Sequence, residues 1–305
     1  MRIGIISAYQ KDDWHAQQIA AVAERSAEVE IVEPSDFDIE VTNGESGLRC
    51  ANRDALDYDL FLTPRPLGDG GHADFQLDFY ELLANSGAPM VNEVKALLAA
   101  IDKFKSSWAF QQAGLPGPRV VVSQKPARAL EALDQMGRVV VKPLYGSLGD
   151  GIEMLHSDRA RDRERLVERV ADEGAVYLQQ YVETPIADVR AFVVGGRVEA
   201  AVARRPVEGE FRSNLELGAD AQPITLSPAA EWVAVAAARA VGLDYSGVDL
   251  LITKGGPLVL EVNGTPSFKF LYEATGSNMA EPIVAHALNR ARIRALSGGT
   301  AIHGH

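Results

Sequence analysis

The sequence lacks the features that mark disulfide-bonded, membrane-spanning and exported proteins. It contains one cysteine, Cys50, which excludes an intrachain disulfide and is typical of a reducing compartment. No apolar run approaches the roughly 20 residues that a membrane-spanning helix needs. The N-terminal segment MRIGIISAYQ has no signal-peptide pattern. We therefore expect a cytoplasmic protein that does not enter a membrane.

Basic residues are in the minority, because 30 Lys and Arg stand against 42 Asp and Glu and give a formal net charge of −12. This balance argues against a broad surface for nucleic acid or anionic lipid, although it says little about a single pocket. A dinucleotide fingerprint is missing too, since the segment SAYQKDDW after the first apolar run contains no G-x-G-x-x-G. A dehydrogenase built on the N-terminal segment is therefore not predicted.

Strand-like and helix-like segments alternate along the first 93 residues. Such alternation predicts a small α/β domain with a parallel sheet. The expected strands are Arg2–Ser7, Val29–Val32 and Leu60–Thr63, and the expected helices are Trp14–Arg25 and Phe75–Leu83. The full length of 305 residues leaves room for one or two further cores.

The remaining chain has a different pattern. A long helix is expected over Val94–Ala113, and two hairpins are predicted to turn at Gly195-Gly196 and at Lys254–Gly256. Further strands, separated by helices, are expected at Val120–Val122, Val139–Val141 and Val176–Gln180. We expect a mixed α/β (α+β) chain with parts at residues 1–93, 94–185 and 186–296, followed by a disordered tail at 297–305.

The segment VVVKPLYGSLGDG, residues 139–151, places a lysine at the end of an apolar strand and glycines directly after it. Gly146, Gly149 and Gly151 allow backbone N–H groups to converge on a polyanion. Lys142 adds a positive charge for the same phosphates. The lysine precedes the glycines, which excludes a Walker P-loop. A glycine flap over a nucleotide is the physical interpretation, and a lysine that simply turns into water is the plainer alternative.

Carboxylates interrupt the apolar strands of the second hairpin, GVDLLITKGGPLVLEVN. A three-residue connection would pair Thr253 with Pro257 and hence Asp249 with Glu261. Asn263 would share their face, because side chains alternate along a strand. Opposed carboxylates destabilise a strand pair unless a cation lies between them, and oxygen ligands of this kind suit Mg²⁺. The pattern predicts a magnesium site, unless the pair lies on a solvated face or a bulge at the turn glycines shifts the register.

Arginines crowd the segment between these two patterns. Arg190 shares a strand face with Asp188, and Arg212 lies in the polar segment GEFRSNLELG. Arg204 and Arg205 end the partner strand. Arginine binds carboxylate and phosphate oxygens through paired hydrogen bonds, which suits a phosphoryl group in transfer. The alternative is that these arginines form surface salt bridges to the many acids of the chain.

Taken together, these segments resemble the ATP-grasp ligases. The resemblance covers roughly Leu60–Ala287 and is carried, in this order, by VVVKPLYGSLGDGIEML, YLQQYVE, DVRAFVVGGRVEAAVARR, GEFRSNLELG and GVDLL…GPLVLEVNGTP. Within that group the chain is most similar to the RimK-like branch, the α-L-glutamate ligases. The resemblance implies an ATP-grasp fold with an N-terminal α/β domain, a central lid domain and a C-terminal domain, with ATP between the last two.

The resemblance also implies roles for individual residues. The implied nucleotide contacts are Lys103, Lys142, Gly146, Ser147, Gly149, Gly151, Arg212, Ser213 and Asn214, with Gln180, Tyr181 and Val182 around the adenine and Asp188 at the ribose. The implied metal ligands are Asp249, Glu261 and Asn263, in agreement with the hairpin argument. The expected catalytic cations are Lys142, Arg190 and Arg212, and Arg65 and Arg204 are expected on the substrate side.

The implied reaction joins an amino acid, expected to be L-glutamate, to a carboxylate that ATP first activates as an acyl phosphate. The expected cofactors are ATP and Mg²⁺, with Mn²⁺ as a substitute. Three carboxylate acceptors stay open: a pterin or deazaflavin coenzyme tail, a peptide such as a ribosomal-protein C-terminus, and free amino acids. Outside enzymes, the alternative is an ATP-binding regulatory module, and a homo-oligomer is compatible with either interpretation.

The chain departs from the resemblance at three places. Gln180 stands where many relatives have glutamate, and Asp150 places an acid among the expected phosphate-binding glycines. After the expected metal ligands the chain reads NGTPSFKFLYEATG, where ribosomal-protein-modifying members usually have a glycine-rich NxSPG segment. Because that segment borders the acceptor, the departure bears on the identity of the acceptor and not on the chemistry.

Overall fold

The computed structural model describes residues 1–8, 13–42, 45–67, 72–144, 151–184, 188–205 and 220–296. Its strands are β1 (Arg2–Ser7), β2 (Glu28–Val32), β3 (Phe37–Thr42), β4 (Glu45–Cys50), β5 (Arg53–Asp54), β6 (Leu60–Arg65), β7 (Met90–Val91), β8 (Val120–Ser123), β9 (Arg138–Lys142), β10 (Glu153–His156), β11 (Val176–Gln180), β12 (Val189–Val194), β13 (Arg197–Arg205), β14 (Asp220–Pro223), β15 (Tyr245–Thr253) and β16 (Gly256–Asn263). Its helices are α1 (Trp14–Ala23), α2 (Ala73–Asn85), α3 (Val94–Ile101), α4 (Lys103–Gln112), α5 (Pro126–Met136), α6 (Ala160–Glu173), α7 (Pro228–Val241), α8 (Lys269–Thr275) and α9 (Ala280–Leu296), with short 3-10 turns η2 (Pro34–Asp36) and η3 (Ala55–Asp57). The predicted mixture of helices and strands is confirmed.

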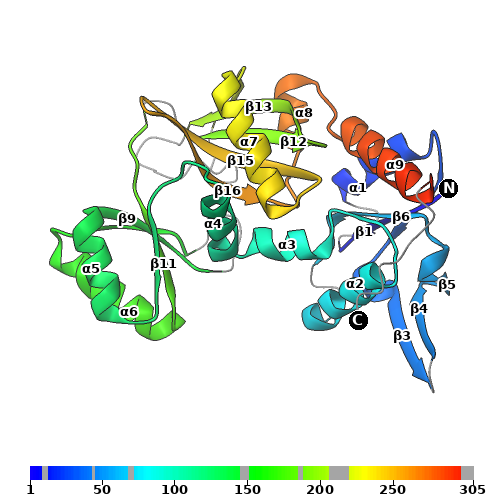
Figure 1. Ribbon diagram of the computed structural model, residues 1–305, viewed down its shortest axis with the longest axis horizontal. Helices are drawn as coiled ribbons and strands as arrows, with labels where there is room; N and C mark the ends of the chain where they lie inside the picture. Colours follow the sequence, from blue (N-terminus) through cyan, green and yellow to red (C-terminus); the bar gives the residue numbers. More distant parts are fainter. Residues whose placement is uncertain are drawn as a thin grey trace.

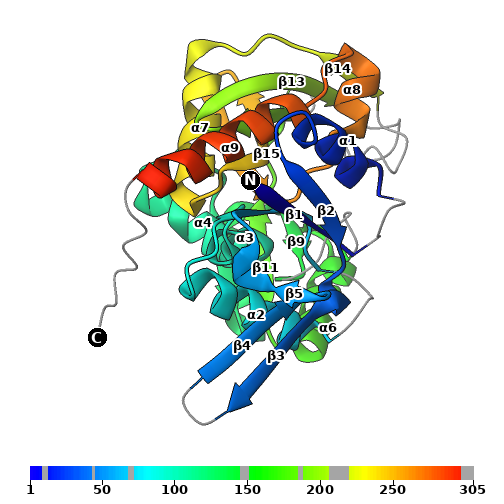
Figure 2. The ribbon, with the colours of Figure 1, turned by 90° about the vertical axis from the view of Figure 1, so that its right-hand side faces the viewer.

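The N-terminal sheet is parallel and has the strand order β2-β1-β6-β7. Its first three strands arise from the apolar runs that the sequence analysis identified. Strands β3, β4 and β5 form a separate antiparallel sheet that was not expected, and the β3–β4 hairpin extends away from the rest of the molecule (Figure 2). The base of this hairpin is anchored because Phe37, Leu48 and Cys50 share a core with α2 and β6.

The central sheet, which we call the lid sheet, is antiparallel with the order β10-β9-β11-β8. Helices α5 and α6 cover one of its faces (Figure 1). Val139, Val141 and Leu178 pack against these helices, so alternation places Lys142 and Tyr177 on the opposite face. Strand β10 was not expected from the sequence. The lid sheet thus presents one face that α5 and α6 leave open.

The C-terminal sheet has the strand order β14-β13-β12-β15-β16. Helices α3, α4 and α7 pack against one face of this sheet and form a common core with it. The expected single helix over Val94–Ala113 is wrong, because Asp102 has an extended backbone and separates α3 from α4. Asp102 Oδ1 accepts hydrogen bonds from Phe104 N at 2.9 Å and Lys105 N at 3.0 Å, which satisfies the free N–H groups at the start of α4.

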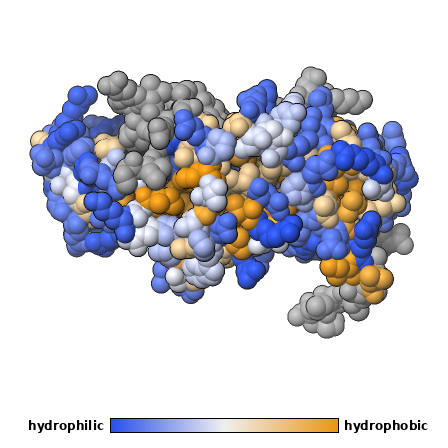
Figure 3. All heavy atoms as spheres, turned by 90° about the horizontal axis from the view of Figure 1, so that it is seen from above, coloured by the Kyte–Doolittle hydropathy of each residue, from blue (hydrophilic) through white to orange (hydrophobic). Residues whose placement is uncertain are grey.

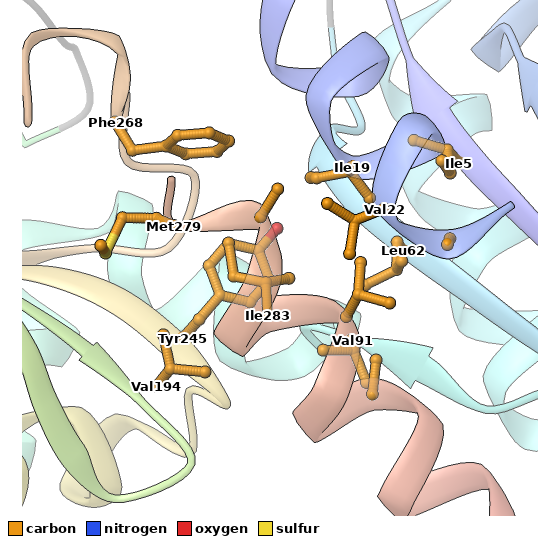
Figure 4. Packing of buried hydrophobic residues seen from close by; sticks show 14 of the residues in the cluster. Ile5, Ile19, Val22, Leu62, Val91, Val194, Tyr245, Phe268, Met279 and Ile283 are labelled. Carbon is orange, nitrogen blue, oxygen red and sulfur yellow. The ribbon is translucent and has the colours of Figure 1, made fainter. Parts of the chain in front are cut away.

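A shared hydrophobic core joins the N-terminal and C-terminal sheets (Figure 4). Ile5 and Leu62 of the N-terminal sheet contribute to this core together with Val194 and Tyr245 of the C-terminal sheet. Helix α9, near the C-terminus of the chain, completes this core by packing beside α1, which lies near the N-terminus (Figure 2). These two parts of the molecule therefore meet through a packed interface, which fixes the position of one relative to the other.

The lid sheet has its own core, separate from the shared one. Seen from above, hydrophobic residues gather toward the middle of the molecule, whereas the lid end is mainly hydrophilic (Figure 3). The predicted boundaries at residues 93, 185 and 296 stay predictions, although α3 and α4 share their hydrophobic core with the C-terminal sheet. Within the described ranges, no helix combines the length and the apolar character needed to cross a membrane.

Candidate active site

A line of charged side chains crosses one face of the C-terminal sheet. The strand pairing sets Arg190 opposite Asp249, and Asp249 opposite Glu261. Because residues two apart along a strand share a face, the same face also carries Asp188, Arg204 and Asn263. The expected pairing of Asp249 with Glu261 is confirmed, whereas their role as metal ligands stays a prediction.

The hairpin reaches this pairing by a different route from the expected one. Its turn has two residues, not three, and Thr253 lies opposite Gly256. This turn alone would place Asp249 out of register with Glu261. An extra residue in β16, Leu260, forms a bulge that restores the pairing. The predicted partner of Thr253 was therefore wrong by one residue, and the bulge compensates for that error.

Asp249 is held by two arginines in a buried network. Its Oδ1 accepts from Arg190 Nε at 2.7 Å, and its Oδ2 accepts from Arg190 Nη2 at 2.7 Å and from Arg204 Nη2 at 2.8 Å. Arg204 in turn donates from Nε to Asp188 Oδ1 at 2.8 Å. Burial alone would raise the pKa of Asp249, but the charges of Arg190 and Arg204 outweigh burial and hold that pKa well below its usual range. Asp249 is therefore an ionised carboxylate.

Lys142 reaches from the lid sheet to the C-terminal sheet. Its Nζ lies 3.7 Å from Glu261 Oε2, and the lysine side chain is only 7% exposed while that of Glu261 is 37% exposed. The charges of Lys142 and Glu261 also affect the pKa of Lys103, the first residue of α4. Burial lowers the pKa of Lys103, Glu261 raises it, and Lys142 lowers it again. Lys142 thus contacts Glu261, and the charge of Glu261 also acts on Lys103, although contact of either lysine with a nucleotide stays a prediction.

Three polar residues near Lys142 were missed by the sequence analysis. Tyr177 lies opposite Lys142 in the lid sheet, and its hydroxyl is 2.8 Å from Ser107 Oγ on α4. Gln179 Nε2 donates to the same hydroxyl at 3.3 Å. Burial raises the pKa of Tyr177 to about 12, so the phenol is neutral at physiological pH. The register of β9 with β11 identifies Tyr177 and Gln179, and the contact of α4 with the lid sheet identifies Ser107; one sequence contains neither.

The expected adenine contacts lie where β11 leaves the lid sheet. Gln180 shares its strand face with Leu178, which packs against the lid helices. Tyr181 N donates to Arg138 O at 3.0 Å, and the Arg138 guanidinium lies 4.7 Å from the centre of the Tyr181 ring. Val182 follows in the segment that connects the lid sheet to β12. Contact of these residues with adenine stays a prediction.

Arg65 connects the N-terminal sheet to the edge of the charged face. Its Nη1 donates to Thr265 O at 2.7 Å, just beyond the end of β16. The same residue, Thr265, donates from its backbone N to Asn263 Oδ1 at 2.9 Å. Arg65, expected on the substrate side, and Asn263, an expected metal ligand, therefore both bond to the backbone of Thr265.

Several expected site residues lie outside the described ranges. These are Gly146, Ser147, Gly149 and Asp150 of the glycine segment and Arg212, Ser213 and Asn214 of the RSN segment. Gly151 is described, and its backbone has a φ of +67°, a conformation that favours glycine. Its carbonyl oxygen accepts a hydrogen bond from Arg169 Nη1 at 2.8 Å, which ties the end of the glycine segment to α6.

The donor set on the charged face fits a magnesium ion. Asp249, Glu261 and Asn263 offer only oxygen atoms, the ligands that Mg²⁺ prefers. Each carboxylate oxygen has two lone pairs, so Asp249 Oδ1 can accept the hydrogen bond from Arg190 and still offer a lone pair to a cation. Among the described residues, no group of three or more His, Cys, Asp or Glu is placed to hold a metal. A mixed set of two carboxylates and one amide is therefore the arrangement that these residues offer.

Two comparisons of sequence point to one family. The sequence model described as the RimK-like ATP-grasp domain matches residues 100–287. The "Probable alpha-L-glutamate ligase" of Aliivibrio fischeri is 32% identical over 288 residues, which cover 93% of this chain and 94% of that protein. The "Tetrahydromethanopterin:alpha-L-glutamate ligase" of Methanosarcina acetivorans is 33% identical over 257 residues, which cover 75% and 79%.

Solved structures share the fold. The ATP-grasp ligase PsnB complexed with its minimal precursor has a TM-score of 0.75 at 19% identity, with 94% of this chain and 98% of that chain covered. A second structure of PsnB, complexed with minimal precursor, Mg and ADP, has a TM-score of 0.72 at 19% identity and covers 95% and 98%. At such identities the likeness concerns the fold alone. The predicted ATP-grasp fold and the predicted resemblance to RimK-like proteins are confirmed.

Proposed function

The chain belongs to the RimK-like ATP-grasp family, and on this premise we propose that it is an ATP-dependent ligase that joins L-glutamate to a carboxylate. The predicted enzyme class, a ligase, is the class that the names of the curated relatives state. The observation that carries the proposal is the charged face itself, where Asp249 is paired with Glu261 and Glu261 contacts Lys142 of the lid sheet. This arrangement brings metal-binding oxygens and a phosphate-binding cation to one place.

The first step transfers the γ-phosphoryl group of ATP to the acceptor carboxylate. When bound, Mg²⁺ neutralises the phosphate oxygens, and Asp249, Glu261 and Asn263 are the residues that would hold it. Lys142 from the lid sheet and Lys103 from α4 supply positive charge to the phosphates. Arg190 and Arg204 keep Asp249 ionised and correctly oriented, because both donate to its carboxylate.

The charges of the site suit a nucleotide with its metal. The described cations are Lys103, Lys142, Arg190 and Arg204, and the described carboxylates are Asp188, Asp249 and Glu261. This small positive excess favours a polyphosphate that arrives with a divalent cation, since the pair is itself anionic. Lys142 can exchange its partner, Glu261, for phosphate oxygens, because their present contact is 3.7 Å long.

The second step is attack by an amine on the acyl phosphate. A free carboxylate does not react with an amine at neutral pH, because its oxygen is a poor leaving group. The acyl phosphate removes this barrier, but water would hydrolyse it. The lid sheet turns the face with Lys142 and Tyr177 toward the C-terminal part, and this face would exclude water from the intermediate.

The acceptor is the open part of the proposal. One curated relative is named for tetrahydromethanopterin, and PsnB is described with a precursor. We therefore take a coenzyme tail and a peptide C-terminus as the two acceptor classes to test. Mn²⁺ is proposed as a substitute for Mg²⁺, and the reaction is placed in the cytoplasm, where ATP is available.

The test is a mass-spectrometric screen with ATP, Mg²⁺ and L-glutamate. The acceptors are tetrahydromethanopterin and the peptide N-acetyl-Glu-Glu, and ADP is measured in parallel. We expect one acceptor to gain the mass of a glutamyl residue with release of equal ADP. An ATP-binding regulatory module would bind ATP without acceptor-dependent release of ADP, and that result would overturn the proposal.

A substitution on the charged face tests whether the activity depends on this face. Glu261→Ala removes a carboxylate of the proposed metal site and is expected to abolish ADP release with saturating substrates. Glu168→Ala is the matched control, because Glu168 is an exposed residue of α6 whose side chain is 64% accessible. Retained turnover in Glu261→Ala would contradict the assignment of this residue.

A further inference from the structure

A second chain of polar side chains lies where the N-terminal part meets the segment after β16. Ser267 Oγ is 3.0 Å from His15 Nε2, and His15 Nδ1 is 3.1 Å from Asp13 Oδ1. Asp13 Oδ2 also accepts from Ser7 Oγ at 2.8 Å. Asp13 and His15 are almost fully buried, with 6% and 9% of their surface exposed. We call the Ser267, His15 and Asp13 side chains the relay.

The charge state of Asp13 determines which atom donates and which accepts in each hydrogen bond of the relay. Burial would raise the pKa of Asp13, but hydrogen bonds from His15 and Ser7 bring it below the usual range, so Asp13 is ionised. An ionised carboxylate only accepts hydrogen bonds, so His15 donates from Nδ1. A neutral imidazole carries one N–H, and its Nε2 is then an acceptor for the Ser267 hydroxyl. The relay can thus pass a proton from Ser267 toward His15.

The imidazole ring lies in a cluster with two aromatic rings, those of Trp14 and Phe268, which are themselves 5.5 Å apart. Its centre is 5.3 Å from the Trp14 ring and 4.8 Å from the Phe268 ring, and both contacts are edge-to-face. Asp13 is fixed as well, because it caps α1 by accepting from His15 N at 2.9 Å. The geometry is therefore set by packing before any ligand binds.

The relay lies beside the proposed reaction site. Pro266, the residue before Ser267, packs against the backbone of Gly247 in β15. A Cβ atom at Gly247 would lie 3.1 Å from Pro266 Cβ and 3.3 Å from Arg190 Cδ. The segment from Asn263 to Ser267 therefore runs from a proposed metal ligand past Arg190 to the relay. This is also the segment in which the chain departs from the NxSPG pattern.

We propose that the relay accepts the proton of the incoming amine, with Ser267 as the group that touches the amine. The inference rests on the proposed ligase function and adds to it a residue set for the second step. The need for a base is chemical, since the α-amino group of a free amino acid is even more basic than a chain N-terminus, so it is mostly an ammonium at pH 7 and cannot attack a carbonyl. Such a base is worth about 10²–10⁴ in rate.

The proposed step balances in atoms and charge. The ammonium gives one proton to Ser267 Oγ as the hydroxyl proton moves to His15 Nε2, which becomes an imidazolium beside Asp13. The freed nitrogen lone pair forms the C–N bond with the acyl carbon. The bond from that carbon to the phosphate oxygen breaks, and the electron pair leaves with phosphate, which takes the second N–H proton. His15 afterwards returns its proton to solvent.

The order of groups resembles the serine–histidine–aspartate chain of hydrolases. Ser267 is not assigned as a nucleophile, because ATP already activates the carbonyl carbon and an ester to serine would add a step. His15 and Asp13 act through Ser267 and are positioning residues. Their contribution must therefore show in amine transfer and not in the formation of the acyl phosphate.

The test separates the two steps with two nucleophiles. Hydroxylamine is neutral at pH 7 and traps an acyl phosphate as a hydroxamate without help from a base. We expect Asp13→Asn and Ser267→Ala to form hydroxamate within about 3-fold of the wild type, while glutamate transfer falls by about 100-fold. The acceptors are tetrahydromethanopterin and N-acetyl-Glu-Glu. Equal losses with both nucleophiles would assign the relay a merely structural role and overturn the proposal.

Matched variants control for damage to the fold. Asparagine caps a helix as well as aspartate does, so Asp13→Asn keeps the start of α1 intact. Ser7→Ala removes another hydrogen bond to Asp13 but leaves the relay complete, and we expect glutamate transfer within about 3-fold of the wild type. Ser267→Thr keeps the hydroxyl and should recover most of the activity that Ser267→Ala loses. A Ser7→Ala loss as large as that of Asp13→Asn would count against the relay.

A spectroscopic measurement tests the relay without depending on catalytic turnover. Nitrogen-15 spectra of the histidine side chains report which ring nitrogen carries the proton. We expect the neutral His15 ring to carry its proton at Nδ1 and to lose this tautomer preference in Asp13→Asn. Protonation at Nε2 in the wild type would overturn the relay. Failure of the wild type to form any hydroxamate, with the Nδ1 tautomer intact, would instead count against the ligase function.

Discussion

The two charged regions of the site are built in opposite ways. The Arg190–Asp249–Arg204 network lies within one sheet, and its hydrogen bonds measure 2.7–2.8 Å. The Lys142–Glu261 pair spans two sheets at 3.7 Å, and Glu261 is 37% exposed. The first region is complete once the C-terminal sheet has formed. The second depends on how the lid sheet lies against it.

This difference indicates which of the two regions rearranges when the nucleotide binds. Buried networks of charges are costly to disturb, because each charge has lost its water and relies on its partner. A loosely paired lysine with a hydrated partner can exchange that partner for phosphate at little cost. We infer that the arginine network holds a metal ligand ready and that the lysine pair adjusts when nucleotide binds.

The largest effect on stability is expected from breaking the buried network. Arg204→Met removes an arginine that pairs with both Asp188 and the buried Asp249, so we expect a loss of about 3–5 kcal/mol in the free energy of unfolding. Urea denaturation measures it. The control is Arg197→Met, because Arg197 is 81% exposed and its pair with Glu199 is a surface contact worth at most about 1 kcal/mol. Equal losses in the two variants would remove the contrast between the two regions.

Breaking the lysine pair should instead affect activity. Lys142→Met keeps an apolar side chain in a buried position, and the partly exposed Glu261 can be hydrated, so stability should change by less than about 1 kcal/mol. The rate of acyl phosphate formation should fall by about 10²–10³, because a preorganised cation is missing at the phosphates. ADP release and urea denaturation measure the two quantities. A stable variant with full activity would show that Lys142 does not serve the nucleotide.

The smallest effect is a fraction of a proton taken up at Lys103. Burial lowers the pKa of this lysine in the free protein, and ATP phosphates would raise it again. Uptake should therefore grow as pH rises toward the ordinary lysine value of about 10.4. Calorimetry of ATP binding in two buffers with different ionisation enthalpies measures it. Lys103→Arg stays charged and should abolish the uptake, and an unchanged uptake would place the titrating group elsewhere.

Much of the fold could be predicted because apolar runs and alternation are local signals. The runs at Arg2–Ser7 and Leu60–Thr63 became β1 and β6, and the carboxylates of the last hairpin share a face as expected. The break at Asp102 was missed, since an aspartate within a helical pattern is indistinguishable by periodicity from an exposed polar residue. The β3–β4 hairpin was missed although its sequence contains an Asn-Gly pair, which is a strong hairpin signal.

The rest of the site depends on contacts between distant segments. Tyr177 meets Ser107 only because the lid sheet lies against α4, and His15 meets Ser267 across 252 positions of the chain. No local pattern encodes such contacts. The register of Asp249 with Glu261 shows a further limit, because the turn was shorter than expected and the bulge at Leu260 restored the pairing. A correct pairing was thus predicted through two errors that cancel.

The most direct measurement of the central claim is the effect of Mg²⁺ on ATP binding in the wild type and in Glu261→Gln. Glutamine keeps the shape of the side chain but loses the charge that pairs with Lys142 and would hold the metal. We expect Mg²⁺ to tighten ATP binding to the wild type by at least about 10-fold and to the variant by less than about 2-fold, measured by titration calorimetry. An equal gain from Mg²⁺ in both proteins would contradict the account, because the metal would then lie away from the charged face.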